Sequence, residues 1–189
     1  MLNIGIIIGT TRDNRVSPQV AQYILKHAQH RQSAEYQIID IKNFKLPLYN
    51  EPLPALFSTD YQTPEAMAWS DAIKSLDGVI FITAEYNRGI TAALKNALDY
   101  LYSEFANKAA AIVSFGSSGG KSAAHALREI LIGLEVATVK AQPGFNLFTD
   151  FTDMREFTPS DIHNSSINDL FNQLESWAKG LQALRHNAA

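Results

Sequence analysis

The most constraining feature of this sequence is a run of branched aliphatic residues at its start that stops abruptly in glycine and threonine. Five of the seven residues from Leu2 to Ile8 are leucine or isoleucine, a composition typical of a strand buried on both faces of a parallel sheet. Gly9, Thr10 and Thr11 follow directly, before an amphipathic segment from Val16 to Ala28. Such a turn brings hydroxyls, backbone N–H groups and a helix N-terminus together, which is anion-binding geometry.

Two arginines within this turn add positive charge. The guanidinium groups of Arg12 and Arg15 are fork-shaped donors that suit a phosphate dianion. Each charge-assisted bond of this kind contributes roughly 1.5–3 kcal/mol. The same residues are compatible with solvated loop charges and with threonines that only cap a helix. The turn therefore favours a phosphate site without requiring one.

Composition limits the classes of protein to which the chain can belong. At 189 residues, 46% of them hydrophobic, it suits a single α/β domain over residues 1–189. The net charge is −3 and the basic residues are spread along the chain. No basic patch favours nucleic acid or an anionic membrane. We therefore expect a small-molecule ligand.

Cysteine is absent, which excludes disulfides, thiolate nucleophiles and Cys-ligated metal centres. Any redox chemistry then needs a bound cofactor. The chain begins directly in a predicted core strand, and no apolar run approaches the roughly 20 residues that span a bilayer. We expect a cytoplasmic protein with no membrane segment.

Strand and helix patterns alternate five times along the chain. Right-handed crossovers make such an order a doubly wound parallel sheet, for which the five-stranded arrangement is 2-1-3-4-5. A Pro-containing loop over 42–63 and an irregular, aromatic and acidic segment over 142–159 complete the prediction. Strands are expected at 2–8, 35–41, 77–83, 108–115 and 135–140, and helices at 16–28, 64–76, 91–101, 123–134 and 160–186.

The loops after Ile8, Thr83 and Phe115 follow the first, third and fourth predicted strands. In a doubly wound sheet these strands end at the same edge, where ligands bind. We expect the three loops to build one site.

The loop after the fourth strand contains a G-x-S-x-G pattern, which in a strand–turn–helix context presents Ser118 as the nucleophile of a hydrolase. His125 lies on the same predicted helix, where it is badly placed as a base, and only His163 remains. No HGGG-type oxyanion loop occurs. A serine hydrolase stays as a lesser alternative.

Two further patterns in the chain are weaker. Gly120-Lys121-Ser122 resembles the end of a P-loop, but that motif requires glycine where this chain has Phe115. His27 and His30 are three residues apart without a carboxylate at ligand spacing, so we interpret them as surface residues and predict no metal site.

A flavin explains the three loops better. Gly116, Gly119 and Gly120 carry no side chain and permit close approach of a flat ring, and the amide of Asn87 offers a donor for its edge. Donors near the flavin N5, N1 and O2 atoms favour the reduced, anionic ring.

At these residues the chain resembles the NAD(P)H-dependent FMN reductases, a branch of the flavodoxin-like proteins that includes quinone, azo-dye and chromate reductases. The resemblance spans residues 1 to about 140, and its most specific part is the block that begins at Glu85. It rests on GTTRDNR at 9–15, LPLYNEP at 46–52, EYNRGITAALKNALDYL at 85–101 and SFGSSGGKSA at 114–123.

The resemblance implies a flavodoxin-like three-layer sandwich with a site for FMN. It implies the following roles: Thr10, Arg12 and Arg15 hold the phosphate beside Val16 and Ser17; Glu85, Tyr86 and Asn87 contact the ribityl chain and ring edge; and Ser114, Gly116, Gly119 and Gly120 line the pyrimidine end. Apart from the resemblance, we expect Arg88 to meet the phosphates of NAD(P)H at the rim.

This sequence departs from the family pattern at two positions. Ala84 and Thr91 stand where the family usually has proline. Thr91 can replace proline as an N-cap, whereas Ala84 leaves its loop less fixed.

The implied activity is hydride transfer from NAD(P)H to FMN and then to a quinone, free flavin, azo compound or similar acceptor, with no side chain required as acid or base. The implied assembly is a homodimer or homotetramer, with the loop 46–57 and the aromatic residues Tyr100, Tyr102 and Phe105 as candidate contacts, although these aromatics are equally compatible with packing inside one chain. A flavodoxin-like one-electron carrier is the second alternative.

Overall fold

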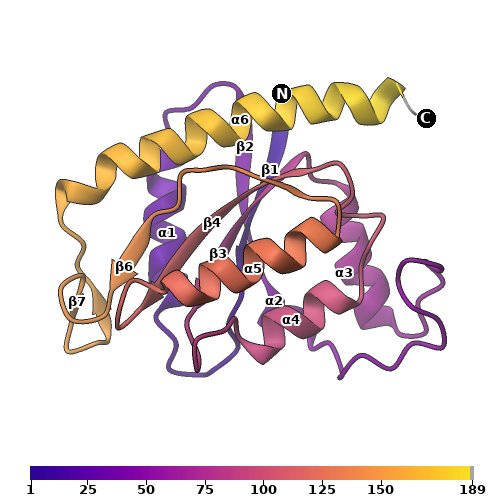
Figure 1. Cartoon of the computed structure of the whole chain (residues 1–189), viewed down its shortest axis with the longest axis horizontal. Helices are drawn as coiled ribbons and strands as arrows, with labels where there is room; N and C mark the ends of the chain where they lie inside the picture. Colours follow the sequence, from indigo (N-terminus) through magenta and orange to yellow (C-terminus); the bar gives the residue numbers. More distant parts are fainter. Residues whose placement is uncertain (188–189) are drawn as a thin grey trace.

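The computed structural model describes residues 1–187 and contains a parallel sheet with helices on both faces (Figure 1). The predicted strand order is confirmed. The path through the sheet is β2 (Ala34–Asp40), β1 (Leu2–Ile8), β3 (Gly78–Ala84), β4 (Ala109–Gly116) and β5 (Ala137–Thr138). All pairs along this path are parallel.

Two hydrophobic clusters, one on each face, hold the helices to the sheet. Ile4, Ile6 and Ile8 pack with α1 (Ser17–Ala28) and α6 (Asn164–Asn187), because alternate residues of a strand point to the same face. The other face packs against α3 (Pro64–Lys74), α4 (Ala92–Asp99) and α5 (Lys121–Gly133). Figure 1 shows α6 along one side of the sheet and α3, α4 and α5 on the other.

None of the helices within residues 1–187 combines the length and the hydrophobicity needed to cross a bilayer. The longest of them, α6, instead packs against the sheet through Ile167, Leu170, Phe171 and Leu174.

Threonine caps begin two of the helices. The Thr63 hydroxyl accepts from the Ala66 N–H at 3.2 Å, and the Thr91 hydroxyl accepts from the Leu94 N–H at 3.1 Å. The predicted role of Thr91 as an N-cap is therefore confirmed. Its hydroxyl also donates to the carbonyl of Gly9, so the start of α4 is fixed to the end of β1.

The last third of the chain differs from the prediction. A fifth strand over 135–140 is wrong in extent, since only Ala137–Thr138 pairs with β4. A separate strand, β6 (Gly144–Asn146), instead pairs with the end of β4. The segment 142–159 is thus not wholly irregular, and it also contains the hairpin of β7 (Phe151–Thr152) and β8 (Glu156–Phe157).

Two helical details were also not predicted. The predicted loop over 42–63 begins within a short helix, α2 (Ile41–Phe44), so residues 42–44 are helical. The closing helix begins as a 3₁₀ turn, η1 (Asp161–His163), before the α-helix continues from Asn164.

A buried lysine closes the C-terminal end of α3. Lys108 is 4% exposed, and its ammonium group donates to the carbonyls of Ile73 and Lys74. Burial lowers the pKa of Lys108 to about 8, and repulsion from Arg185 adds to the decrease. Because the folded pKa lies below the unfolded value, the unfolded chain binds more protons between these two values, and stability rises with pH in that window.

We predict that the unfolding free energy of the wild type will increase relative to that of Lys108→Met by about 1–2 kcal/mol between pH 7.5 and 9.5. Urea denaturation of both proteins at the two pH values measures the difference, and groups common to both cancel. A difference that stays constant or falls with pH would contradict the buried ammonium.

Candidate functional site

Three loops at the carboxyl ends of β1, β3 and β4 enclose a cavity of about 260 Å³, here called the rim cavity. It also receives two side chains from the segment after β5, Leu147 and Met154. The predicted convergence of the three loops on one site is thus reproduced in the structure. The lining residues are Thr10, Arg12, Asn14, Arg15, Val16, Ala84, Glu85, Tyr86, Phe115, Gly116, Leu147 and Met154.

The loop between β1 and α1 leaves the start of α1 open to an acceptor. Val16 is the N-cap residue, and no side chain caps the first turn. The hydroxyls of Thr10 and Ser17, which are 1% and 0% exposed, bond to each other instead. Pro18 has no N–H, and the Gln19 N–H donates to the Val16 carbonyl at 3.0 Å, so the Ser17 N–H is the first-turn donor left for an acceptor at the positive end of the helix dipole.

The two predicted phosphate ligands in this loop are placed differently. Arg15 donates to the carbonyl of Thr10 and forms an ion pair with Asp40 at the end of β2. The side chains of that pair are only 11% and 17% exposed. Arg12 is exposed and lines the rim cavity, and no bond or ion pair to it occurs in the described part of the chain. Arg12 is thus the guanidinium available to an anion, while Arg15 fixes the loop.

Asp40 extends this network beyond Arg15. Its other carboxylate oxygen accepts from the Lys42 N–H at 3.1 Å and caps α2. The Lys42 ammonium in turn donates to Asp13 at 2.6 Å, and this bond lowers the pKa of the exposed Asp13 carboxyl. Hydrogen bonds therefore connect the end of β2 to the loop between β1 and α1.

The loop after β3 connects the other two loops. Glu85 Oε2 accepts from the Ser122 N–H at 2.9 Å and from the Ala123 N–H at 3.3 Å, so it caps α5. Tyr86 and Gly89 exchange two backbone hydrogen bonds, each 3.0 Å long, around Asn87 and Arg88.

Both central residues of this turn adopt left-handed backbone conformations, with φ of 50° at Asn87 and 67° at Arg88. This is the geometry of a tight type I′ turn, which asparagine tolerates well. The turn leaves the side chains of Asn87 and Arg88 exposed at the rim.

The glycines of the loop after β4 are required by its shape. Ser114 is buried and donates to the Gly119 carbonyl at 2.7 Å. Gly120 has φ of +68°, and a Cβ there would lie 2.7 Å from the backbone nitrogen of Phe115. Ser114 and Gly120 therefore fix the loop on its buried side and do not line the rim cavity, whereas Gly116 does line it.

The surroundings of Ser118 do not support a hydrolase. Ser118 and His125 are both exposed, and His163 Nε2 is bonded to Asp150 Oδ1 at 2.7 Å. The His163 ring also packs edge-on against Phe145, with centroids 4.7 Å apart. Within residues 1–187 no imidazole bonds to the Ser118 hydroxyl, so the serine has no base in place.

No group of three or more histidine, cysteine or acidic side chains that could hold a metal ion occurs among the described residues. The surface assignment is correct for His30 and wrong for His27. His27 is half-buried, because its ring bonds to the Tyr23 carbonyl at 2.9 Å and to Asn164 at 3.3 Å.

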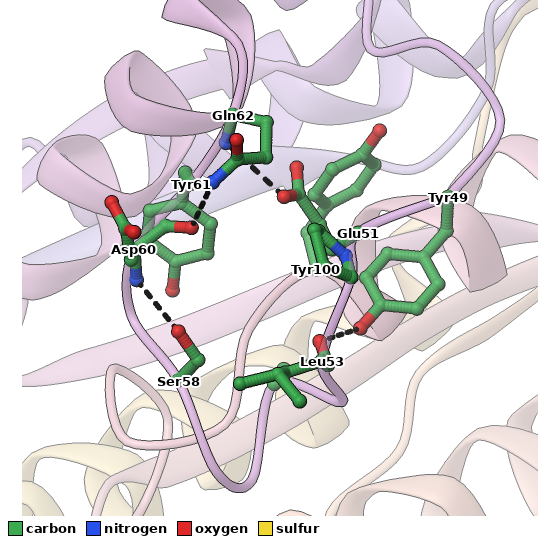
Figure 2. A pocket seen from close by; sticks show the side chains of 10 residues that line it. Tyr49, Glu51, Leu53, Ser58, Asp60, Tyr61, Gln62 and Tyr100 are labelled. Carbon is green, nitrogen blue, oxygen red and sulfur yellow. Dashed lines mark hydrogen bonds between the residues drawn. The ribbon is translucent and has the colours of Figure 1, made fainter.

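A second cavity lies in the loop before α3 and is distinct from the rim cavity. Figure 2 shows its lining, in which Tyr49, Glu51 and Gln62 belong to the loop and Tyr100 follows α4. The Tyr49 hydroxyl donates to the Leu53 carbonyl at 3.0 Å, and Glu51 accepts from the Gln62 N–H at 3.1 Å.

This cavity has a volume of about 90 Å³, well below the roughly 300 Å³ of small ligand sites. Tyr49 N donates to Asn96 on α4 at 2.8 Å, and Asn96 donates back to the Pro47 carbonyl at 2.8 Å. The long loop is therefore ordered by its own bonds and by α4, and the rim cavity is the better candidate for a cofactor.

Comparison with known proteins identifies the family. A model of the NADPH-dependent FMN reductases matches residues 2–150. The chain belongs to this family. Membership confirms the predicted oxidoreductase class and the predicted cofactors, FMN and NAD(P)H.

Individual relatives agree with this membership. The NAD(P)H-dependent FMN reductase LOT6 of Saccharomyces cerevisiae is 35% identical over 148 residues, which cover 73% of this chain and 78% of the relative. A quinone reductase of Pseudomonas putida is 30% identical, covering 82% and 86% of the two chains. The structure of the NAD(P)H:(acceptor) oxidoreductase FerB from Paracoccus denitrificans superposes with a TM-score of 0.72, at 19% identity and with 95% and 98% coverage, which supports the flavodoxin-like fold.

Sequence reasoning missed several residues of the rim cavity. Asn14 lies within the predicted loop but was not singled out, and Phe115 was assigned only to a strand. Leu147 and Met154 carry no motif, and they reach the cavity because β6 and the following hairpin return to the edge of the sheet. No local pattern in the sequence identifies such contacts.

The two arginines give a matched pair of variants. We predict that Arg12→Ala will weaken FMN binding about 10-fold or more, because a charge-assisted phosphate bond is lost, with little change in stability. Arg15→Ala should instead lower the unfolding free energy by about 1–3 kcal/mol, because Asp40 loses its partner.

Flavin fluorescence titration and urea denaturation of both variants measure the two effects. Unchanged FMN affinity in Arg12→Ala would remove this residue from the site.

Proposed function

We propose that this chain, as one FMN-binding domain over residues 1–189, transfers two electrons from NAD(P)H through FMN to a quinone. The observation that carries the proposal is the rim cavity. The chain belongs to the NADPH-dependent FMN reductases, and its rim cavity lies at the start of α1, where no side chain caps the helix and where the Arg12 guanidinium is free.

The phosphate end of FMN fits the first turn of α1. The Ser17 N–H and the Arg12 guanidinium are donors, while Thr10, whose hydroxyl is bonded to that of Ser17, lines the wall of the cavity. Helix starts of this kind favour anions through both hydrogen bonding and the helix dipole. The start of α5 offers no comparable position, since Glu85 already occupies it.

The ring end fits the space between Tyr86 and Gly116. Tyr86 is 37% exposed and provides an aromatic surface, while Gly116 presents only backbone. The cavity of about 260 Å³ is smaller than most cofactor pockets, so this arrangement leaves part of the ring at the open rim. An open ring face is what a nicotinamide and an acceptor need in order to bind in turn.

When bound, FMN accepts a hydride from NAD(P)H and passes two electrons to the acceptor. The protein's own residues bind the phosphate, orient the ring and offer backbone donors at its edge. Glu85, the acidic side chain that lines the rim cavity, is engaged by the amides of α5, so the protons that the reduced acceptor takes up come from solvent.

A quinone is proposed as the acceptor because it is flat and can stack on an exposed ring face in the same way as nicotinamide. The name of the Pseudomonas putida relative supports this choice. Azo compounds and free flavin share the flat shape and are the other acceptors to be compared. NAD(P)H as the reductant is consistent with a cytoplasmic location, which we also propose.

Steady-state kinetics test the function. We predict that the FMN-loaded protein will oxidise NADPH or NADH in the presence of benzoquinone, with parallel lines in double-reciprocal plots, because both substrates use one face of the ring. The flavodoxin-like carrier predicts instead that NAD(P)H is not consumed. Labelling of Ser118 by a fluorophosphonate, on a protein that binds no FMN, would favour the hydrolase.

We further propose a homodimer in which the loop 46–57 makes the contact, with a homotetramer as the larger alternative. Leu48 and Phe57 are 84% and 74% exposed, and an exposed apolar loop of this kind marks an interaction surface. Tyr100 and Phe105 do not contribute, because they are 1% and 0% exposed in the chain's own core.

We predict that Leu48→Ser combined with Phe57→Ser will convert the oligomer to a monomer in light-scattering measurements. The matched control is Ile132→Ser, which is 69% exposed and belongs to α5 rather than to this loop. A wild type that is itself monomeric at micromolar concentration would contradict the proposed assembly.

A further inference from the structure

The hairpin of β7 and β8 borders the rim cavity although it lies outside the matched family region. The family model ends at residue 150, and the hairpin pairs Phe151 with Phe157 and Thr152 with Glu156. Its tip carries Met154, whose side chain is 56% exposed and lines the cavity together with Arg12 and Val16. A methionine on the Arg12 side of the rim cavity has no role in the function described above.

The hairpin is fixed to α1 by a single glutamine. Gln19 Nε2 donates to the Arg155 carbonyl at 2.8 Å, and Gln19 Oε1 accepts from the Phe157 N–H at 2.8 Å. The Phe157 ring also packs edge-on against Tyr23 and Phe145, with centroids 5.2 and 4.8 Å apart. The tip of the hairpin is therefore held against the same helix whose first turn is open to an anion.

The backbone at the tip supports a specific placement of the methionine. Asp153 and Met154 both have left-handed conformations, with φ of 50° and 55°. Such conformations are unfavourable for side chains larger than glycine or asparagine. Only Met154 of these two residues lines the rim cavity.

We propose that Met154 covers the phosphate end of the bound FMN and slows its release. The inference rests on the proposed function, since it assumes that FMN occupies the rim cavity. A flexible thioether side chain can adapt to the ribityl chain and exclude water from it. Water exclusion also strengthens the attraction between the Arg12 guanidinium and the phosphate, because the local dielectric constant falls.

The left-handed pair provides a matched control. Met154→Gly and Asp153→Gly both place glycine at a left-handed position of the same turn, so they change the backbone in the same way, but only the first removes a cavity side chain. Met154→Leu keeps an apolar side chain of similar size. Each protein is loaded with FMN and diluted to a concentration far below its dissociation constant, and the release rate is followed by the recovery of the fluorescence of free FMN.

We expect Met154→Gly to release FMN about 3- to 10-fold faster than the wild type, with most of the affinity change in the release rate. Asp153→Gly and Met154→Leu should stay within about 2-fold of the wild type. Gln19→Ala, which removes the two hydrogen bonds between the hairpin and the Gln19 side chain, should also accelerate release. Equal release rates in Met154→Gly and Asp153→Gly would overturn the role of Met154 while leaving the proposed function intact. A wild type that binds no FMN would overturn both.

Discussion

The absence of a side-chain cap at the start of α1 is the feature on which the site depends. Of the helices that begin at this edge of the sheet, α2 and α4 are capped by Asp40 and Thr91, whereas the first-turn N–H groups of α1 and α5 are not capped by the N-cap residue itself. At α5 these groups are satisfied by Glu85 from the neighbouring loop. At α1 no side chain does so. The edge therefore offers one anion position rather than two, and the position lies beside Arg12.

The rest of the edge is organised to keep this position in place. Arg15, paired with Asp40, holds the loop before α1 against the end of β2, and Glu85 holds the loop after β3 against α5. Thr91 bonds the start of α4 to the carbonyl of Gly9. Charged and polar side chains that a sequence motif assigns to the ligand thus serve partly to fix the loops. A preformed site of this kind loses little entropy when a cofactor binds.

The sequence predicted the parts of the structure that local patterns determine. The central strands β1, β3 and β4 are buried on both faces, so their continuous apolar runs are unmistakable, and their order follows from the handedness of the crossovers. The fifth strand was predicted with the wrong extent and β6 was not predicted, because two or three residues have no periodicity and their pairing depends on β4. Arg12 and Arg15 could not be distinguished, since the partner of Arg15 lies 25 residues away along the chain. Met154 had no signal at all, because its position comes from a hairpin docked on α1.

A crystal structure of the protein with FMN tests the central claim most directly. We predict the phosphate within hydrogen-bonding distance of the Ser17 N–H at the start of α1 and of the Arg12 guanidinium. We also predict that Arg15 remains paired with Asp40. A phosphate bound at the start of α5, or a rim cavity without the nucleotide, would contradict that claim.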